Sequence, residues 1–291
     1  VFTTLPWTED EIAELQAVVA PAKLTVALEA PPLEEQVAAM TKDEKDFLYK
    51  RCNVTEGKEI GWFNYCTEPG SRHVNNLGYC WQAEFRSYHI WTHPAIMKYK
   101  YMIWMDSDAR VGTHWDGDND PMKMMVENDL NLLYSGFPYG QTKNVKIKEK
   151  MEKAYNKSIC AVHKSSDGSL NPHMCKGSSS FELKQVAGNH HISNLETYRK
   201  PVHQKFLKDF VGDYRFARQF DDQIAITIPA VMEDGKKAWH ERSHGLVLKI
   251  GHHGMFDNVG SDRSIRPWRN WYKKTKGNFT GLEERCGKYL E

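Results

Sequence analysis

The chain has 291 residues, 40% of them hydrophobic and 26% charged, which are the proportions of a folded globular protein and not of a disordered or fibrous one. Its 39 basic residues nearly balance its 38 acidic ones, for a formal net charge of +1, so we expect no nucleic acid among its partners. No apolar run approaches the roughly 18 residues that cross a bilayer, and residues 1–5 do not resemble a secretory signal. We therefore expect any membrane anchor to lie outside this sequence.

The cysteines and the glycosylation motifs bear on the cellular compartment. No two cysteines form a CxxC pair, so a zinc ribbon is not expected, and their even number permits three disulfides without requiring them. N-x-[ST] motifs occur at Asn53, Asn156 and Asn278. Together these features favour a secretory compartment. The six cysteines are Cys52, Cys66, Cys80, Cys160, Cys175 and Cys286.

Two capping boxes mark the first predicted helices. Thr8 with Glu11, and Thr41 with Glu44, place a hydroxyl at the N-cap and a carboxylate three residues later, an arrangement that satisfies the first amides of a helix. These pairs predict helices at residues 8–20 and 41–51. The other elements that we expect before residue 97 are a strand at 24–28, a long loop at 53–76 and a helix at 85–96.

An apolar and aromatic run at residues 99–105 (YKYMIWM) predicts a central strand of a buried sheet. It leads directly into Asp106, Ser107 and Asp108. Ligands of open α/β sheets bind beyond the carboxyl ends of the strands, and two carboxylates spaced i and i+2 there can hold a divalent cation. Mn²⁺ and Mg²⁺ favour such hard oxygen ligands, and a bridging cation stabilises the charge of a departing diphosphate. The sequence therefore predicts a Mn²⁺ or Mg²⁺ site that receives a nucleotide sugar.

The rest of the chain alternates helices and strands without a linker, a repeat or a low-complexity tract. Asp120 and Pro121 predict the N-cap and the first position of a helix that runs to about Asp129. We predict one α/β domain over residues 1–291. The later elements expected are a strand at 130–139, a charged helix at 143–157, a polar loop at 165–180, helices at 195–211 and 221–228, the latter ended by Pro229, and a strand at 246–250.

Other side chains are candidates for the same site. His252 and His253 follow the last predicted strand, and a neutral imidazole is a suitable third ligand for Mn²⁺, although a pair of loop histidines is the alternative. Asp221, Asp222 and Gln223 open a helix, where the carboxylates either cap the helix or face sugar hydroxyls. Further candidates near a sugar are Glu182, His190 and His191, while Tyr79, Trp81, Trp104 and Trp115 either stack on a sugar or a base or belong to the core.

Four segments carry a resemblance that extends over most of the chain. VFTTLPWTEDEI at residues 1–12 is similar to a VF-x-ND-x-PFTEEF motif, and HP followed by KYKY at 93–101 is similar to HP-x-x-x-KYRYYWR. DPM with EN at 120–128 is similar to DP-x-x-x-M-x-x-NN, and the helix at 195–210 to DLDFFRS…YQKYFDYLD. These motifs belong to the fungal Golgi α-1,2-mannosyltransferases, glycosyltransferase family 15, which the chain therefore resembles.

A second, local resemblance falls on the candidate site. WMDSDA at residues 104–109, DDQ at 221–223 and HG at 253–254 are similar to WWMDSDA, DDQSA and HGFW of the plant xyloglucan xylosyltransferases and related galactosyltransferases, glycosyltransferase family 34. Both families have the GT-A fold, an α/β fold with a mixed central sheet flanked by helices. Both use Mn²⁺ and retain the anomeric configuration of the transferred sugar. The resemblance implies the same fold, cofactor and stereochemistry here.

The resemblance also assigns roles to residues. It implies that Asp106, Asp108 and His253, or His252 in a register shifted by one, bind the metal, and that Asp222 with Asp221 lies at the reaction centre. Family 15 has Glu-Pro-Asp where this chain has Asp106, Ser107 and Asp108, which shortens the first carboxylate. The candidate nucleophile of that family, a glutamate in SNFEI, corresponds either to Glu182 or to His191. For donor and acceptor binding we predict Ser107, Gln223, Tyr79, Trp81 and His252.

The expected activity is a retaining, metal-dependent transfer of mannose from GDP-mannose to a hydroxyl of a glycan or glycoprotein. The local motifs leave UDP-xylose or UDP-galactose as alternative donors, and a catalytically inactive glycan-binding relative and a hydrolase with paired carboxylates are further alternatives. The resemblance implies a type II membrane protein whose catalytic domain lies in the Golgi lumen. The similarity begins after the first strand of the family, so this strand either precedes the present sequence or is lacking in the protein.

Overall fold

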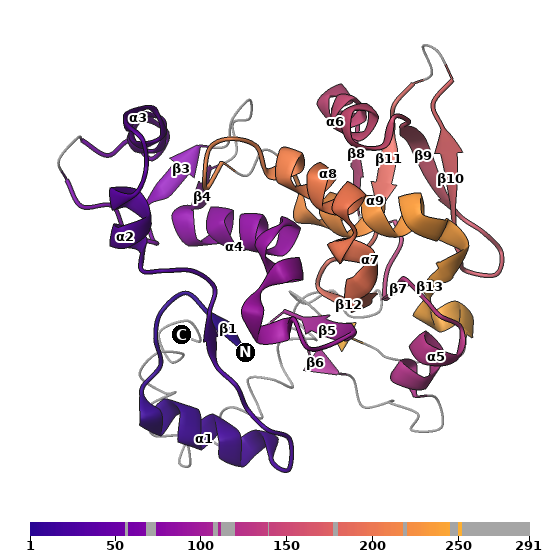
Figure 1. Cartoon of the computed structure of the whole chain (residues 1–291), viewed down its shortest axis with the longest axis horizontal. Coiled ribbons are helices and arrows are strands. Elements are labelled where there is room, and N and C mark those ends of the chain that lie inside the picture. The colour runs from indigo at the N-terminus through magenta and orange to yellow at the C-terminus, as the bar shows by residue number, and fades with distance from the viewer. Residues whose placement is uncertain are drawn as a thin grey trace.

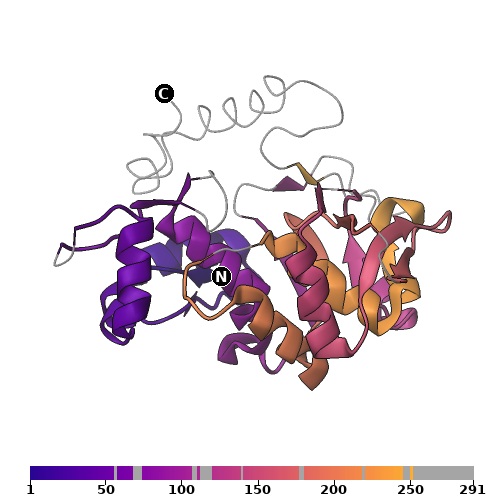
Figure 2. The same cartoon turned by 90° about the horizontal axis from the view of Figure 1, so that it is seen from above.

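The computed structural model describes residues 1–55, 58–67, 74–106, 110–111, 120–138, 140–176, 180–217, 220–244 and 250–251. The N-terminal elements lie on one side of the molecule and a sheet with its helices on the other, with α4 between them (Figures 1 and 2). Among the described residues, no helix has both the length and the apolar character that crossing a bilayer requires. The prediction of one domain over residues 1–291 stays a prediction, because residues 252–291 lie outside the described part.

The N-terminal side begins with β1 and ends with α4. Both predicted capping boxes are present, since the amide of Glu11 donates to Thr8 Oγ1 and that of Glu44 to Thr41 Oγ1, each at 3.3 Å. The predicted strand at 24–28 is confirmed only as β2, which pairs in parallel with β1. The bounds here are β1 Phe2–Thr3, α1 Glu9–Val19, β2 Ala27–Leu28, α2 Leu33–Ala38, α3 Lys42–Arg51, β3 Tyr65–Thr67, β4 Val74–Asn76 and α4 Leu77–Ser87, followed by 3₁₀ turns at His89–Thr92 and Pro94–Ile96.

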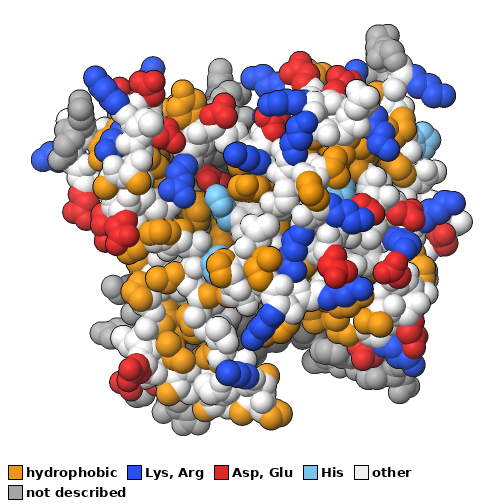
Figure 3. All heavy atoms as spheres, in the orientation of Figure 1, with side chains coloured by type: hydrophobic (Ala, Val, Ile, Leu, Met, Phe, Trp, Pro, Cys, Tyr) orange, Lys and Arg blue, Asp and Glu red, His pale blue; other side chains and the backbone are white. Residues whose placement is uncertain are grey.

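The helix α1 stands out from the body of the protein. None of its residues is buried, and Val18 of its apolar stripe is exposed. Hydrophobic side chains accordingly gather over this region at the lower left of Figure 3, whereas acidic and basic side chains are interspersed over the right-hand part of the same face.

Two segments predicted as loops contain strands, so those predictions were wrong. Within residues 53–76, β3 pairs antiparallel with β4, and a disulfide joins Cys52 to Cys66. Within residues 165–180, β10 pairs antiparallel with β9, and a second disulfide joins Cys160 to Cys175. The strands β3, β4 and β10 have only three to five residues, so any alternation of apolar and polar residues in them is too brief to be recognised.

The second side of the molecule is built around a four-stranded sheet of order β13-β7-β12-β5. The strand β12 runs antiparallel to β5 and to β7, and β13 runs parallel to β7. The sheet is therefore mixed, as predicted. The bounds are β5 Tyr101–Met105, β6 Arg110–Val111, α5 Pro121–Glu127, β7 Leu132–Tyr134, β8 Gly140–Thr142, α6 Val145–Tyr155, β9 Ile159–Lys164, β10 Leu170–Met174, β11 Leu183–Gln185, β12 His190–Asn194, α7 Leu195–Arg199, α8 Pro201–Val211, α9 Asp222–Asp234, β13 Ala238–His240 and β14 Ile250–Gly251, with 3₁₀ turns at Gly235–Lys237 and Glu241–His244.

Each face of the sheet packs against a different hydrophobic cluster. Leu132 and Tyr134 of β7 belong to the large cluster that includes α4, α8 and α9, whereas Leu133 and Ile192 pack with Met125 of α5. Successive strand residues point to opposite faces, which explains this division. The strand β5 was predicted to be central, but among the described strands it lies at the edge of the sheet, since β12 is its only hydrogen-bonded neighbour there.

Proline has different effects in two predicted helices. The helix predicted at 195–211 is two helices, because Pro201 has no amide to continue α7 and begins α8 instead. The helix predicted to end at Pro229 runs on to Asp234. Most of α9 is buried, so its packing offsets the backbone hydrogen bond that Pro229 cannot make.

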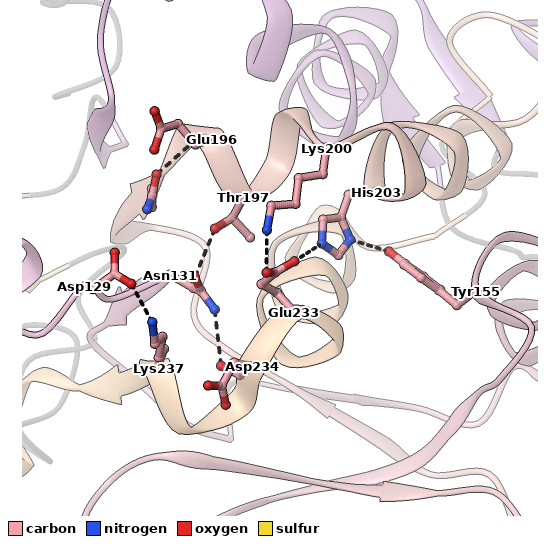
Figure 4. A network of polar contacts seen from close by, with 11 residues as sticks. Asp129, Asn131, Tyr155, Glu196, Thr197, Lys200, His203, Glu233, Asp234 and Lys237 are labelled. Carbon is pink, nitrogen blue, oxygen red and sulfur yellow. Dashed lines mark hydrogen bonds and ion pairs between the residues drawn. The ribbon is translucent and has the colours of Figure 1, made fainter.

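A chain of polar contacts connects the helices α6, α8 and α9 (Figure 4). Tyr155 Oη of α6 lies 2.9 Å from His203 Nδ1 of α8, and His203 Nε2 lies 3.2 Å from Glu233 Oε2 of α9. Lys200 completes the chain by donating to Glu233 Oε1 at 2.5 Å. Burial lowers the pKa of His203, so the imidazole is neutral at pH 7 and acts as a hydrogen-bonding link between the helices.

Candidate functional site

The topology brings the candidate residues to one edge of the sheet. Because β12 is antiparallel to β5 and β7, and β13 is parallel to β7, the carboxyl ends of β5, β7 and β13 meet the beginning of β12. Asp106 follows β5 at this edge, and its amide donates to the carbonyl of Asn189 at 3.0 Å. This is the edge at which open α/β sheets bind their ligands.

An arginine that the sequence analysis did not single out connects the two principal carboxylates. Arg86 lies near the end of α4, and its Nη1 atom is 3.3 Å from Asp106 Oδ1 and 3.1 Å from Asp222 Oδ2. The side chains of Arg86, Asp106 and Asp222 are only 9%, 14% and 6% exposed. The structure thus brings Asp106 and Asp222, which are 116 positions apart in the sequence, to the same nitrogen of one buried guanidinium.

Neighbouring groups fix the arginine and the first carboxylate. The indole Nε1 of Trp104 donates to Asp106 Oδ1 at 2.6 Å, and the guanidinium carbon of Arg86 lies 4.6 Å from the centre of the Trp104 ring, a cation–π contact. Arg86 Nη2 also donates to the carbonyl of Gly188. A Cβ added at Gly188 would lie 2.8 Å from Gln223 Cγ and 2.9 Å from Arg86 Nη2, so a larger residue there would require these side chains to shift.

The charge of this cluster suits a cation. Among the described residues, the one guanidinium of Arg86 faces two carboxylates, so acidic groups outnumber basic ones in this part of the site. The second carboxylate, Asp222, has an Oδ2 atom that makes no well-oriented hydrogen bond despite its ion pair. Asp106 supplies the hard oxygen ligand that Mn²⁺ or Mg²⁺ prefers. The described residues therefore fit one side of a divalent-cation site.

The remaining predicted ligands lie outside the described residues. These are Asp108 and His253, together with Ser107 and His252 of the predicted donor-binding set. In the part of the chain that the structure describes, no three His, Cys, Asp or Glu side chains are grouped so that they could hold a metal ion. Their assignment to the metal and the donor stays a prediction.

His191, one of the two candidates for the nucleophile position, lies close to the arginine. It is paired in register with Trp104 of β5, and its Nδ1 atom lies 2.9 Å from Ser193 Oγ. Burial, and then the charge of Arg86, lower the pKa of His191 well below its ordinary value. The structure therefore places a neutral imidazole beside the Arg86 cluster, where it can accept or donate a hydrogen bond but carries no charge.

Asp221 and Gln223 sit at the start of α9. Asp221 is the N-cap residue, and its Oδ1 atom accepts from the Gln223 amide at 3.4 Å. The side-chain amides of Gln223 and Gln185 meet at 3.1 Å. Asp221 thus serves as a helix cap, one of the two alternatives that its sequence position allowed, and directs the first turn of α9 towards Arg86.

The structure places Glu182, the other candidate nucleophile, apart from this cluster. Its side chain is 46% exposed and pairs with Lys143 at 3.8 Å. The described residues therefore bring His191, and not Glu182, to the Arg86 cluster.

We expect Glu182→Gln to change the transfer rate less than about twofold, because an exposed ion pair contributes little. Steady-state kinetics would measure kcat, with Lys143→Gln as the matched control that breaks the same ion pair. A loss of 100-fold or more in Glu182→Gln alone would instead assign it to the reaction centre.

The two aromatic candidates of α4 differ in their surroundings. Tyr79 is 45% exposed and is able to contact a ligand. Trp81 is 1% exposed, and its indole nitrogen donates to Glu29 Oε2 at 2.9 Å. Its ring packs against Phe85 and Phe216. The predicted stacking of Trp81 on a substrate is therefore corrected, because a ring covered on all sides by the core presents no face to a ligand.

A second buried pair at this end of the sheet was not recognised in the sequence as a pair. His190 Nδ1 of β12 lies 3.6 Å from Glu241 Oε2, which follows β13. None of the three atoms involved, His190 Nδ1 and the two carboxyl oxygens of Glu241, has a hydrogen-bond partner among the described residues. Burial lowers the pKa of His190 to about 4 and raises that of Glu241 to about 8. Both groups are therefore neutral at pH 7.

The raised pKa of Glu241 predicts a pH dependence of stability. Between the ordinary pKa of 4.5 and the folded value of about 8, the unfolded chain has released a proton that the folded protein keeps, so stability falls as the pH rises through this window. Glu241→Gln should remove this loss, raising the free energy of unfolding at pH 8.5 by on the order of a few kcal/mol. Urea unfolding at pH 4.5 and 8.5 would measure it.

The matched control for this measurement is Glu233→Gln. The pKa of Glu233 is lowered in the folded protein, so this substitution should destabilise the protein at neutral pH. An equal effect of Glu241→Gln at both pH values would contradict a raised pKa.

Comparisons with known proteins address the fold. Core-mannan synthase A (CmsA/Ktr4) from Aspergillus fumigatus, in its Mn/GDP form, matches with a TM-score of 0.57 and 17% identity, over 94% of this chain and 74% of that chain. The mannosyltransferase Ktr4p from S. cerevisiae matches with TM-scores of 0.53 alone and 0.50 with GDP, at 10% and 11% identity, over 86% of this chain. No protein-family model matches the chain, and no curated protein matches it by sequence.

These similarities establish the fold class. The chain has the fold of the fungal mannosyltransferases to which the family 15 motifs pointed, and the predicted GT-A-type architecture is confirmed. It spans 60% of the length of Ktr4p.

Proposed function

We propose that this chain is the catalytic domain of a retaining, metal-dependent mannosyltransferase that uses GDP-mannose and a glycan or glycoprotein hydroxyl as acceptor. The observation that carries the proposal is the pairing of Asp106 and Asp222 across one buried arginine at the carboxyl edge of the sheet. The shared fold supports it, because core-mannan synthase A is described in a form with Mn and GDP. Burying two carboxylates beside one arginine is costly, and a bound cation would offset that cost.

The proposed mechanism assigns a part to each residue. Asp106, with Asp108 and His253, would hold Mn²⁺, which neutralises the charge of the departing diphosphate. Asp222 would orient the sugar and stabilise positive charge at its anomeric carbon. The acceptor hydroxyl would attack the face from which the diphosphate leaves and pass its proton to a phosphate oxygen, so that no strongly basic side chain is needed. The neutral His191 would act as a hydrogen-bonding group and not as an ion.

The cellular location is part of the same proposal. The two disulfides, Cys52–Cys66 and Cys160–Cys175, support an oxidising compartment, since such bonds do not persist in the cytosol. A catalytic domain in the Golgi lumen, carried by a membrane anchor outside this sequence, would satisfy this condition. Mapping the disulfides in protein isolated from its native cell would test it, and reduced cysteines would contradict it.

We expect GDP to bind tightly only when Mn²⁺ is present, and UDP to bind at least about tenfold more weakly, a difference of 1.4 kcal/mol. Isothermal titration calorimetry with each nucleotide, with and without Mn²⁺, measures both. Preference for UDP would redirect the donor to UDP-xylose or UDP-galactose. If neither nucleotide binds, the chain is an inactive glycan-binding relative. Release of free sugar without an acceptor would identify a hydrolase.

A further inference from the structure

The arginine at the centre of the site has no part in the mechanism described so far. Arg86 pairs through a single nitrogen, Nη1, with both Asp106 and Asp222. The same guanidinium is held by the carbonyl of Gly188 and by the face of Trp104. Its position is thus fixed by groups that carry no net charge, while its charge is divided between two carboxylates.

A charge divided in this way has a consequence for metal binding. The first carboxylate is a predicted metal ligand, and the second is predicted to face the sugar. Both are almost fully buried, so in the absence of metal they would repel one another strongly without the arginine. When a cation occupies Asp106, the guanidinium and the cation compete for the same carboxylate, and Asp222 remains available to keep the arginine in place.

We propose that Arg86 is a shared counter-ion: a positioning residue that holds Asp106 and Asp222 in place before the metal binds, and that gives up Asp106 to the metal while staying paired with Asp222. This inference rests on the proposed function for the identity of the metal. This arrangement keeps the two carboxylates in place without metal. It also weakens metal binding, because the guanidinium competes with the cation for Asp106. Arg86 therefore links the metal side of the site to the sugar side.

The first experiment needs no metal. In the otherwise unchanged protein, Arg86→Met should lower the melting temperature by roughly 10 °C, because it removes the cation with which both buried carboxylates are paired. In a protein that carries Asp106→Asn and Asp222→Asn, the same substitution should raise the melting temperature, because the arginine is then itself a buried unpaired charge. This reversal of sign is the expected result, and differential scanning calorimetry would measure it.

The matched control is Arg199→Met. Arg199 donates to the carbonyls of Trp91 and Ile96, each at 2.9 Å, so its substitution should lower the melting temperature equally in both backgrounds. If Arg86→Met behaves in the same way, Arg86 is a packing residue and the proposal is overturned. Should Arg86→Met fail to fold, Arg86→Lys takes its place, with a smaller loss expected in the first background and no loss in the second.

The second experiment measures Mn²⁺ binding directly, by electron paramagnetic resonance of the free ion. Arg86→Met should bind Mn²⁺ about tenfold more tightly, since one competing positive charge is removed, whereas kcat for transfer should fall at least 100-fold because Asp222 loses its support. Arg86→Lys should bind Mn²⁺ nearly as the unchanged protein does, with an intermediate kcat. If Arg86 had only a structural role, Arg86→Met would weaken Mn²⁺ binding and lower kcat together.

The two proposals fail in different ways. Weaker Mn²⁺ binding in Arg86→Met overturns the shared counter-ion and leaves the proposed function standing. If the unchanged protein does not bind Mn²⁺ at all, the proposed function fails, and the reversal of the melting-temperature change in metal-free protein then decides whether Arg86 is shared between the two carboxylates.

Discussion

Asp106→Asn should lower kcat for sugar transfer at least about 1,000-fold while leaving the protein folded, because the substitution removes the negative charge that binds the cation and keeps the shape of the side chain. The asparagine oxygen is still able to accept from Trp104 Nε1, which lies 2.6 Å from Asp106 Oδ1, and Arg86 keeps Asp222 as its partner. The melting temperature should therefore be equal to that of the unchanged protein or higher. A radiolabelled donor assay at saturating Mn²⁺, together with calorimetry, would measure both quantities.

Asp129→Asn is the matched control for this substitution. Asp129 also forms an ion pair, with Lys237, but both side chains of this pair are exposed and the pair lies outside the site. Its substitution should leave kcat unchanged. Near-normal turnover of Asp106→Asn would show that the metal assignment is wrong.

Trp81→Ala should destabilise the protein by roughly 3–5 kcal/mol, the cost of removing a fully buried tryptophan and leaving a cavity. The side chain is in the core, where its indole nitrogen also donates to the partly buried carboxylate of Glu29. Urea unfolding monitored by circular dichroism would give the free energy of unfolding. The folded fraction should retain its affinity for nucleotide and acceptor.

Tyr79→Ala, two residues earlier in the same helix, is the control with the opposite expectation. Tyr79 is exposed at the start of α4, so stability should change by less than about 0.5 kcal/mol, and any effect should appear in the KM of the donor or acceptor. If Trp81→Ala proved as stable as the unchanged protein but bound its substrates more weakly, Trp81 would have to be reassigned to the substrate site.

Local sequence determined those elements whose signals lie within a few residues. The boxes at Thr8 and Thr41 fixed the starts of α1 and α3, and Asp120 with Pro121 fixed the start of α5, because capping is a contact between near neighbours. The strand that ends at Met105, directly before Asp106, was recognisable from its apolar run. The short hairpin strands β3 and β10 were missed, because a few residues with one solvated face give almost no periodic signal.

The composition of the site was only partly determined by sequence. Asp106 and Asp222 were identifiable because each stands at the end of a strand or the start of a helix, where a motif is readable. Arg86 was not, since a single arginine inside a predicted helix is usually a solvated side chain. Trp81 was misassigned for the related reason that burial depends on contacts distant in sequence, here with Glu29 and Phe216.

Local pattern was enough to predict the type of fold and to locate the acidic motif after β5, whereas the metal chemistry assigned to that motif stays a prediction. Only the tertiary structure decided that one arginine is shared between Asp106 and Asp222, that His191 and not Glu182 lies beside it, and that Glu241 is buried against His190. The strength of a charge interaction depends on distance and on the surrounding dielectric. Both are set by how α4, β5, β12 and α9 pack together, which no local stretch of sequence specifies.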